Sequence, residues 1–172
     1  MELDPDIAAH YAQGVERARL STSSRLEVER TWVLLQRFLP APPAVVLDVG
    51  GAEGAYALPL ARAGYTVHLL DPAPEHVHAA RAASREQPSV PLASVEVGDA
   101  RALPAEDGTV DVVLLFGPLY HQREADQRGQ ALAEARRVLR AGGCCWRRGS
   151  PALPPPSTAC APARSPSRPS RP

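Results

Sequence analysis

The sequence predicts a doubly wound α/β fold, in which helices cover both faces of a parallel sheet. Short apolar runs alternate with longer stretches of helical pattern over residues 44–143. The runs are nearly continuous, as in residues 112–115, which is typical of strands buried on both faces of a sheet. Glycine or aspartate follows several runs, at the strand ends where such sheets bind their ligands.

Helical signals come first along the chain. Residues 5–19 can form one helix, and Ser24 with Glu27 makes a capping box in front of a second. The apolar stripe of this second helix consists of Val28, Trp32, Leu35 and Leu39. Because proline breaks helices, Pro40 ends the second helix, and we assign residues 1–43 to an N-terminal helical segment.

Strands and helices then alternate as far as residue 143. The expected strands are residues 44–49, 65–70, 92–97 and 110–116. The expected helices are residues 54–63, 74–86 and 125–140. Gly64 follows the first of these helices, Pro74 suits the first turn of the second, and Gly142 with Gly143 ends the third. This alternation favours parallel strands joined by right-handed crossovers.

Composition excludes several classes of enzyme. All 19 basic residues are arginine, so the chain lacks the lysine that P-loop hydrolases, pyridoxal enzymes and protein kinases require. The acidic start of the chain and the absence of an apolar run of about 18 residues predict a soluble, cytoplasmic protein without membrane association. The oligomeric state stays open.

Charge and spacing also bear on partners. Residues 1–143 carry 14 arginines against all 19 acidic residues and show no basic, aromatic-laced face, so we expect no nucleic-acid partner. His76 and His78 are two residues apart on an expected helix, and the cysteines form no Cys-x-x-Cys pair. We therefore expect no metal site.

Residues at four strand ends are the candidates for function. They are Asp48, Gly50, Gly51 and Gly54 after the first run, Asp71 after the second, Asp99 and Ala100 after the third, and Phe116 at the end of the fourth. Glycines let the backbone turn sharply and let a ligand approach the main chain. An acid in the position of Asp71 can accept hydrogen bonds from a ribose diol. The four strand ends should converge on one crevice.

These motifs resemble those of the class I S-adenosylmethionine-dependent methyltransferases. The first motif of that family is an apolar strand followed by Asp-x-Gly-x-Gly-x-Gly; Asp48, Gly50 and Gly54 match it, and Ala52 replaces the middle glycine. Gly-Asp-Ala-Arg-Ala-Leu-Pro at residues 98–104 and Arg-Arg-Val-Leu-Arg-Ala-Gly-Gly at residues 136–143 extend the resemblance. It implies a Rossmann-like fold of the class I methyltransferase type, with residues 44–143 as the core that binds S-adenosyl-L-methionine.

The resemblance also implies roles for the candidate residues. The three glycines face the methionine portion of the cofactor, Asp71 holds the ribose hydroxyls, and Asp99 meets the adenine amino group. Asp48 orients the turn or reaches the methionine ammonium, and residues 1–43 cover the cofactor and a small-molecule methyl acceptor. The acceptor atom stays open among O, N, C and S.

No residue is assigned as catalytic from the sequence. His121 is the candidate base because it follows the fourth strand, near the expected methyl position, and Tyr120 and Tyr11 are candidate pocket residues. His121 equally suits a structural role as a cap of the next helix.

Two other readings remain beside the methyltransferase. A nicotinamide-dependent, NAD(P)-type oxidoreductase would use a similar sheet, but its Gly-x-Gly-x-x-Gly pattern is not reproduced by glycines at 50, 51 and 54. A degenerate, catalytically inactive remnant that only binds the cofactor is the other alternative.

Residues 144–172 differ in composition from the rest of the chain. They hold five arginines, no acidic residue, all three cysteines and 8 of the 19 prolines, and their apolar residues follow no period. We expect a disordered tail, arising from a truncation or a shifted reading frame, in place of the family's later strands. The sheet would then be incomplete after the fourth strand, and residues 110–116 would form an exposed apolar edge.

Overall fold

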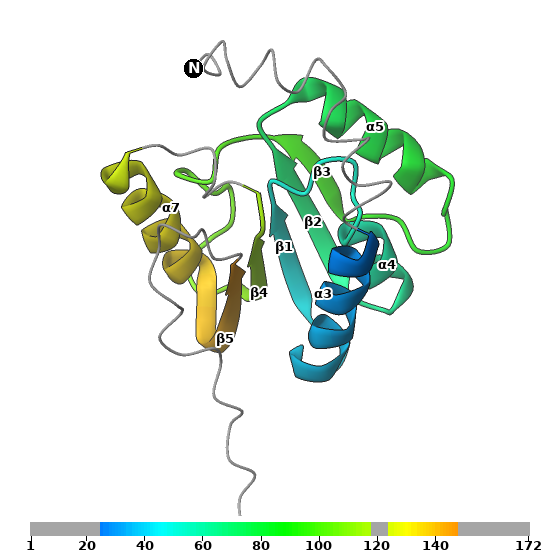
Figure 1. Ribbon diagram of the computed structural model, residues 1–172, viewed down its shortest axis with the longest axis horizontal. Helices are drawn as coiled ribbons and strands as arrows, with labels where there is room; N and C mark the ends of the chain where they lie inside the picture. Colours follow the sequence, from blue (N-terminus) through cyan, green and yellow to red (C-terminus); the bar gives the residue numbers. More distant parts are fainter. Residues whose placement is uncertain (1–24, 118–123, 148–172) are drawn as a thin grey trace, which may run out of the picture.

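The computed structural model describes residues 25–117 and 124–147 (Figure 1). In chain order the elements are α3 (Arg25–Phe38), β1 (Val45–Val49), α4 (Ala57–Arg62), β2 (Thr66–Asp71), α5 (Pro74–Arg85), β3 (Ser94–Val97), β4 (Val110–Leu115), α7 (Ala125–Val138) and β5 (Leu139–Arg147). The four expected strands are present within two residues of their expected ends. The expected helix at residues 5–19 lies outside the described residues.

The five strands form one parallel sheet. Their order is β3-β2-β1-β4-β5, and every neighbouring pair is parallel. The predicted doubly wound α/β class is therefore confirmed. The chain runs outward from β1 to β3, then returns across β1 to β4 and β5, so the order reverses between β1 and β4. In such sheets ligands bind at this reversal.

Helices cover both faces of the sheet, and the core lies in two layers. Helices α3, α4 and α5 pack on one face and α7 on the other (Figure 1). Successive strand residues point to opposite faces, so Leu114 packs with the first group of helices while Leu115 packs with α7. Both side chains are fully buried, which explains the nearly continuous apolar runs.

The prediction that the sheet is incomplete after the fourth strand is wrong. Strand β5 pairs with β4 at Leu139 and again over residues 144–147, with Cys144 beside Val112 and Trp146 beside Leu114. The Cys144 side chain is buried in the core, and the Trp146 ring lies 6.2 Å from that of Phe38 between centroids. The boundary at residue 143 is therefore too early, because residues 144–147 belong to the sheet. The remainder of the expected tail, residues 148–172, lies outside the described residues.

The two glycines that suggested a helix end belong to an irregularity within β5. Helix α7 ends at Val138, and the backbone is already extended at Leu139. The pairing of β5 with β4 then shifts in register, Gly142 has φ of +84°, and a β-carbon at Gly143 would lie 2.9 Å from the carbonyl oxygen of Asp111. Glycine in a strand often marks such a bulge or a close backbone approach. The strand thus continues past the glycines instead of stopping at them.

No helix among residues 25–117 and 124–147 is long and apolar enough to cross a membrane.

Candidate functional site

The carboxyl ends of the parallel strands meet at one edge of the sheet, as expected. Asp71 at the end of β2 pairs with Val97 at the end of β3. The residue after β4 also approaches the turn after β1, because a β-carbon added at Gly117 would lie 3.2 Å from the carbonyl oxygen of Gly50. The ends of β1, β2, β3 and β4, which the predicted residues occupy or follow, therefore lie along one edge of the sheet, and this edge includes the reversal of strand order between β1 and β4.

The turn after β1 passes three times through the left-handed region of the backbone. The φ angles are +71° at Gly50, +48° at Ala52 and +92° at Gly54. The amides of Gly50 and Gly51 both donate to the carbonyl oxygen of Leu70, at 2.7 and 3.4 Å, and tie the turn to β2. Glycine adopts such angles freely, whereas alanine is strained in them. The turn is thus built for glycine at all three positions, although alanine occupies one.

Asp48 is buried beneath this turn, with 1 % of its surface exposed. Its Oδ2 atom has no hydrogen-bond partner within the described part of the chain, and a β-carbon added at Gly51 would lie 2.8 Å from it. Burial, together with the negative charge of Asp71, raises the pKa of Asp48 to about 7, against the opposing effect of a hydrogen bond from the Ala57 amide. Buried acceptors without a donor are rare, so this oxygen marks a place where another group can donate.

Asp71 lies at the end of β2, where it was predicted, and its carboxylate already accepts hydrogen bonds from its own chain. Oδ2 accepts from the Ala52 amide at 2.9 Å, and Oδ1 accepts from the Ala73 amide at 3.0 Å. The Nδ1 atom of His76 lies 3.1 Å from Oδ1, and this hydrogen bond is the main reason that the pKa of His76 is raised. Since a carboxylate offers about four acceptor positions, Asp71 retains about one.

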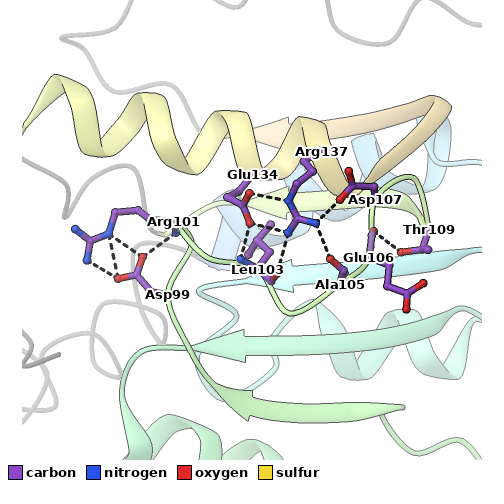
Figure 2. Close-up of polar contacts among 9 residues, drawn as sticks. All are labelled: Asp99, Arg101, Leu103, Ala105, Glu106, Asp107, Thr109, Glu134 and Arg137. Carbon is purple, nitrogen blue, oxygen red and sulfur yellow. Dashed lines mark hydrogen bonds and ion pairs between the residues drawn. The ribbon is translucent and has the colours of Figure 1, made fainter.

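Asp99 is paired with Arg101 on the loop after β3 (Figure 2). The guanidinium donates from Nε to Oδ1 at 2.9 Å and to Oδ2 at 3.1 Å, and from Nη2 to Oδ2 at 2.6 Å. The Arg101 backbone amide adds a bond to Oδ1 at 2.8 Å. The hydrogen bonds from the Arg101 side chain are the main reason that the pKa of Asp99 lies below its usual range. The predicted adenine-binding acid is thus engaged by a neighbouring cation.

The last two predicted residues lie in apolar surroundings. Ala100 is buried against the α7 side of the core. Phe116 is half-buried and meets the ring of Tyr56 edge-on, with 5.0 Å between ring centroids. His121 and Tyr120, as well as Tyr11, lie outside the described residues.

Three residues at this edge were missed by the sequence analysis. His76 was considered only as half of a poor metal pair with His78, whereas it contacts Asp71 five residues earlier. Arg101 stands two residues after Asp99, a spacing that allows a local ion pair, and Tyr56 directly follows the glycine turn. Within residues 25–117 and 124–147, no group of three or more His, Cys, Asp or Glu side chains could hold a metal ion.

A family model described as a methyltransferase domain matches residues 46–143. The matched segment begins in β1 and ends within β5, so it includes the glycine turn, Asp71 and the Asp99–Arg101 pair. It covers more than half of the chain.

The chain is also similar to curated relatives and to solved structures, and one of the relatives is named as a methyltransferase. The chain is 38 % identical over 114 residues to a 37.1 kDa protein in transposon TN4556 of Streptomyces fradiae, a match that covers 64 % of this chain and 31 % of the relative. It is 34 % identical over 122 residues to a ubiquinone/menaquinone biosynthesis C-methyltransferase of Acidiphilium cryptum, a match that covers 69 % of this chain and 47 % of the relative. The crystal structure of the PH0226 protein from Pyrococcus horikoshii is similar with a TM-score of 0.65 and 27 % identity, covering 73 % of this chain and 57 % of that one. This chain thus spans less than half the length of these two curated relatives.

Proposed function

This chain belongs to the methyltransferase domain family, and we propose on that premise that it transfers the methyl group of S-adenosyl-L-methionine to a small-molecule acceptor. The observation that carries the proposal is the turn after β1. Its three residues with positive φ, Gly50, Ala52 and Gly54, occupy the three glycine positions of Asp-x-Gly-x-Gly-x-Gly. The backbone of the motif is therefore retained even where alanine replaces glycine.

The chemistry of the site suits this cofactor. S-adenosylmethionine carries an ammonium, a sulfonium and a ribose diol but no phosphate, so acceptor groups serve it better than a cationic clamp. The Oδ2 atom of Asp48, which has no hydrogen-bond partner in the described part of the chain, can orient the turn or receive the methionine ammonium, directly or through water. Asp71 retains an acceptor position for the ribose, and the turn formed by Gly50, Gly51 and Gly54 leaves backbone accessible to the methionine portion.

The remaining predicted residues flank the proposed cofactor site from the ends of β3 and β4. Ala100 and the Asp99 loop follow β3, and Phe116 with Tyr56 provides an aromatic wall beside the glycine turn. Bound S-adenosylmethionine supplies an electrophilic methyl group on a positively charged sulfur. The chain supplies binding, orientation of the acceptor in line with that sulfur, and exclusion of water.

The acceptor site is proposed to lie between the N-terminal helical segment and the loop after β4. A small molecule is favoured because residues 1–143 are acidic and offer no extended basic face. His121 is proposed as the base for an acceptor that loses a proton.

Calorimetric titration of the full chain with S-adenosylhomocysteine, and in parallel with NADH, tests the cofactor assignment. We expect S-adenosylhomocysteine to bind and NADH not to bind. Asp71→Asn should weaken S-adenosylhomocysteine binding about tenfold or more, because a charge-assisted hydrogen bond becomes a neutral one. Asp126→Asn, a change to an exposed acid on α7, is the matched control and should leave the affinity unchanged. Binding of NADH alone would establish the oxidoreductase alternative.

The proposed base is tested by turnover. Release of S-adenosylhomocysteine would be followed with small hydroxyl, amine, thiol and carbon acceptors, and His121→Ala should lower the rate about 10²–10⁴-fold while preserving cofactor affinity. His78→Ala, which removes an exposed histidine of α5, is the control. Cofactor binding with no turnover on any acceptor would favour the inactive remnant.

A further inference from the structure

The carboxylate of Asp99 has little capacity left for a ligand. Its Oδ1 atom accepts from the backbone amide and from Nε of Arg101, and its Oδ2 atom accepts from Nε and Nη2 of the same side chain. Each carboxylate oxygen offers about two acceptor positions. Both oxygens are therefore occupied by a single neighbouring residue.

The pair is held in place by its surroundings. The Gly98 amide donates to the carbonyl oxygen of Asp71 at 3.1 Å, and the Ala102 amide donates to the carbonyl oxygen of Asp99 at 3.1 Å. The Leu103 amide donates to Glu134 of α7 at 2.9 Å, which fixes the far end of the loop (Figure 2). Both side chains of the pair are about one quarter exposed, so solvent competes only in part with their contact.

We propose that Arg101 withdraws Asp99 from recognition of the purine base, so that this chain discriminates little between an adenine and a purine with a 6-oxo group. The proposal rests on the proposed cofactor function and concerns the specificity of that same site. Arg101 acts as a specificity-determining residue through Asp99.

The proposal is supported by a comparison of two donors to the Asp99 carboxylate, the guanidinium of Arg101 and the amino group of adenine. An arginine–carboxylate pair with several hydrogen bonds is charge-assisted at both ends, whereas the amino group of adenine is a neutral donor. The neutral amino group of adenine therefore competes poorly with the guanidinium for these carboxylate oxygens. With the guanidinium in place, the negative charge that would repel a 6-oxo oxygen is also neutralised.

Removal of the guanidinium should free the Asp99 carboxylate to accept hydrogen bonds and should restore its negative charge. The freed Asp99 carboxylate can then accept from the amino group of adenine, and it faces a 6-oxo oxygen as an unfavourable pair of acceptors. Sites that hydrogen-bond a polar substrate group reject analogues that lack this group strongly, because their own buried polar atoms are left unpaired.

The experiment compares the affinities of the full chain for S-adenosylhomocysteine and S-inosylhomocysteine by calorimetry. In the unmodified chain the two affinities should agree within about threefold. In Arg101→Ala, S-adenosylhomocysteine should bind about tenfold or more better than the inosyl analogue. Arg101→Lys should lie between the two, because an ammonium cannot occupy both carboxylate oxygens as the guanidinium does.

Arg62→Ala is the matched control, since it removes the same charge from an exposed position at the end of α4, where Arg62 donates to Gln87 at 2.7 Å. It should leave the affinity ratio unchanged. If Arg101 has only a structural role, Arg101→Ala would weaken the binding of both ligands equally and would leave the affinity ratio unchanged. That result would overturn the proposal. Tenfold discrimination by the unmodified chain would overturn it as well. If neither nucleoside binds the unmodified chain, the proposed cofactor function fails and this inference with it.

Discussion

Two polar networks of this molecule differ in how completely their atoms are paired. On the α7 side, the guanidinium of Arg137 donates to Glu134, to Asp107 and to the carbonyl oxygens of Leu103 and Ala105, all within 2.9 Å (Figure 2). We call this the Arg137 network. At the ends of β1 and β2, by contrast, Asp48 and Asp71 are both buried, and the ion pair found there among the described residues is that of Asp71 with His76, which requires a protonated His76. We call Asp48, Asp71 and His76 the acid cluster.

The difference separates a structural anchor from a ligand site. In the Arg137 network opposite charges meet, and the loop between β3 and β4 is fastened to α7. In the acid cluster like charges are close, the pKa of Asp48 is raised, and its Oδ2 atom has no partner among the described residues. Buried groups with perturbed pKa values and unmet hydrogen bonds reduce stability and gather at functional sites. Four substitutions test this contrast, from the largest expected effect to the smallest.

Asp48→Asn should remove a strong pH dependence of stability. The folded-state pKa of Asp48, about 7, lies above the ordinary value of 3.8, so the unfolded chain loses this proton first as pH rises. Stability of the unmodified chain should therefore fall between about pH 4 and pH 7, by an amount on the order of 4 kcal/mol from this group. Urea unfolding across this range should show the variant gaining stability over the unmodified chain as pH rises. A stability difference that is constant with pH would contradict the raised pKa of Asp48.

Glu134→Ala should weaken the Arg137 network. The substitution removes two hydrogen bonds from Arg137 and one from the Leu103 amide. We expect a loss of about 2 kcal/mol in the free energy of unfolding, measured by urea denaturation at neutral pH. Glu86→Ala, at an exposed position after α5, should cost much less. Equal effects of the two substitutions would show that the network does not anchor the loop.

His76→Ala should lower stability by about 1 kcal/mol, with a pH dependence opposite to that of an ordinary carboxylate ion pair. The pKa of His76 is raised above its ordinary value of 6.5, mainly by the hydrogen bond with Asp71, so the stabilising contribution of His76 is fully present below pH 6.5 and is lost as pH rises through the folded-state pKa. The cost of the substitution should thus be larger at pH 5.5 than at pH 8.5. His78→Ala, two residues along the same helix and exposed, should show little cost at either pH. A cost that grows with pH would contradict the assignment.

Ala52→Gly should have the smallest effect on the free energy of unfolding, and unlike most substitutions it should stabilise the fold. Alanine at φ of +48° is strained, and glycine relieves the strain at the expense of greater freedom in the unfolded chain, for a net gain of up to about 1 kcal/mol. Ala82→Gly, on the exposed side of α5, should instead lose about 1 kcal/mol. Thermal unfolding would compare them. A loss in both variants would mean that the turn tolerates alanine without strain.

The local sequence predicted the elements well where a pattern repeats within a few residues. Buried strands show as continuous apolar runs, and the glycine turn could be placed because Asp48, Gly50 and Gly54 are close together in the chain. The end of the sheet was harder to predict. Two adjacent glycines, such as Gly142 and Gly143, suit either the end of a helix or an irregularity within a strand. Only the pairing of β5 with β4 decides between the two structures.

The sequence by itself determined the α/β class, the order of the elements and the positions of the acids at the strand ends, because those depend on local pattern and on the chirality of the crossovers. Only the tertiary structure decided how the acids are used. Burial beneath the turn raises the pKa of Asp48, the His76 ring lies against Asp71, and Arg101 closes on both oxygens of Asp99. These states depend on burial and on distances of a few ångströms between side chains, which spacing along the chain does not specify.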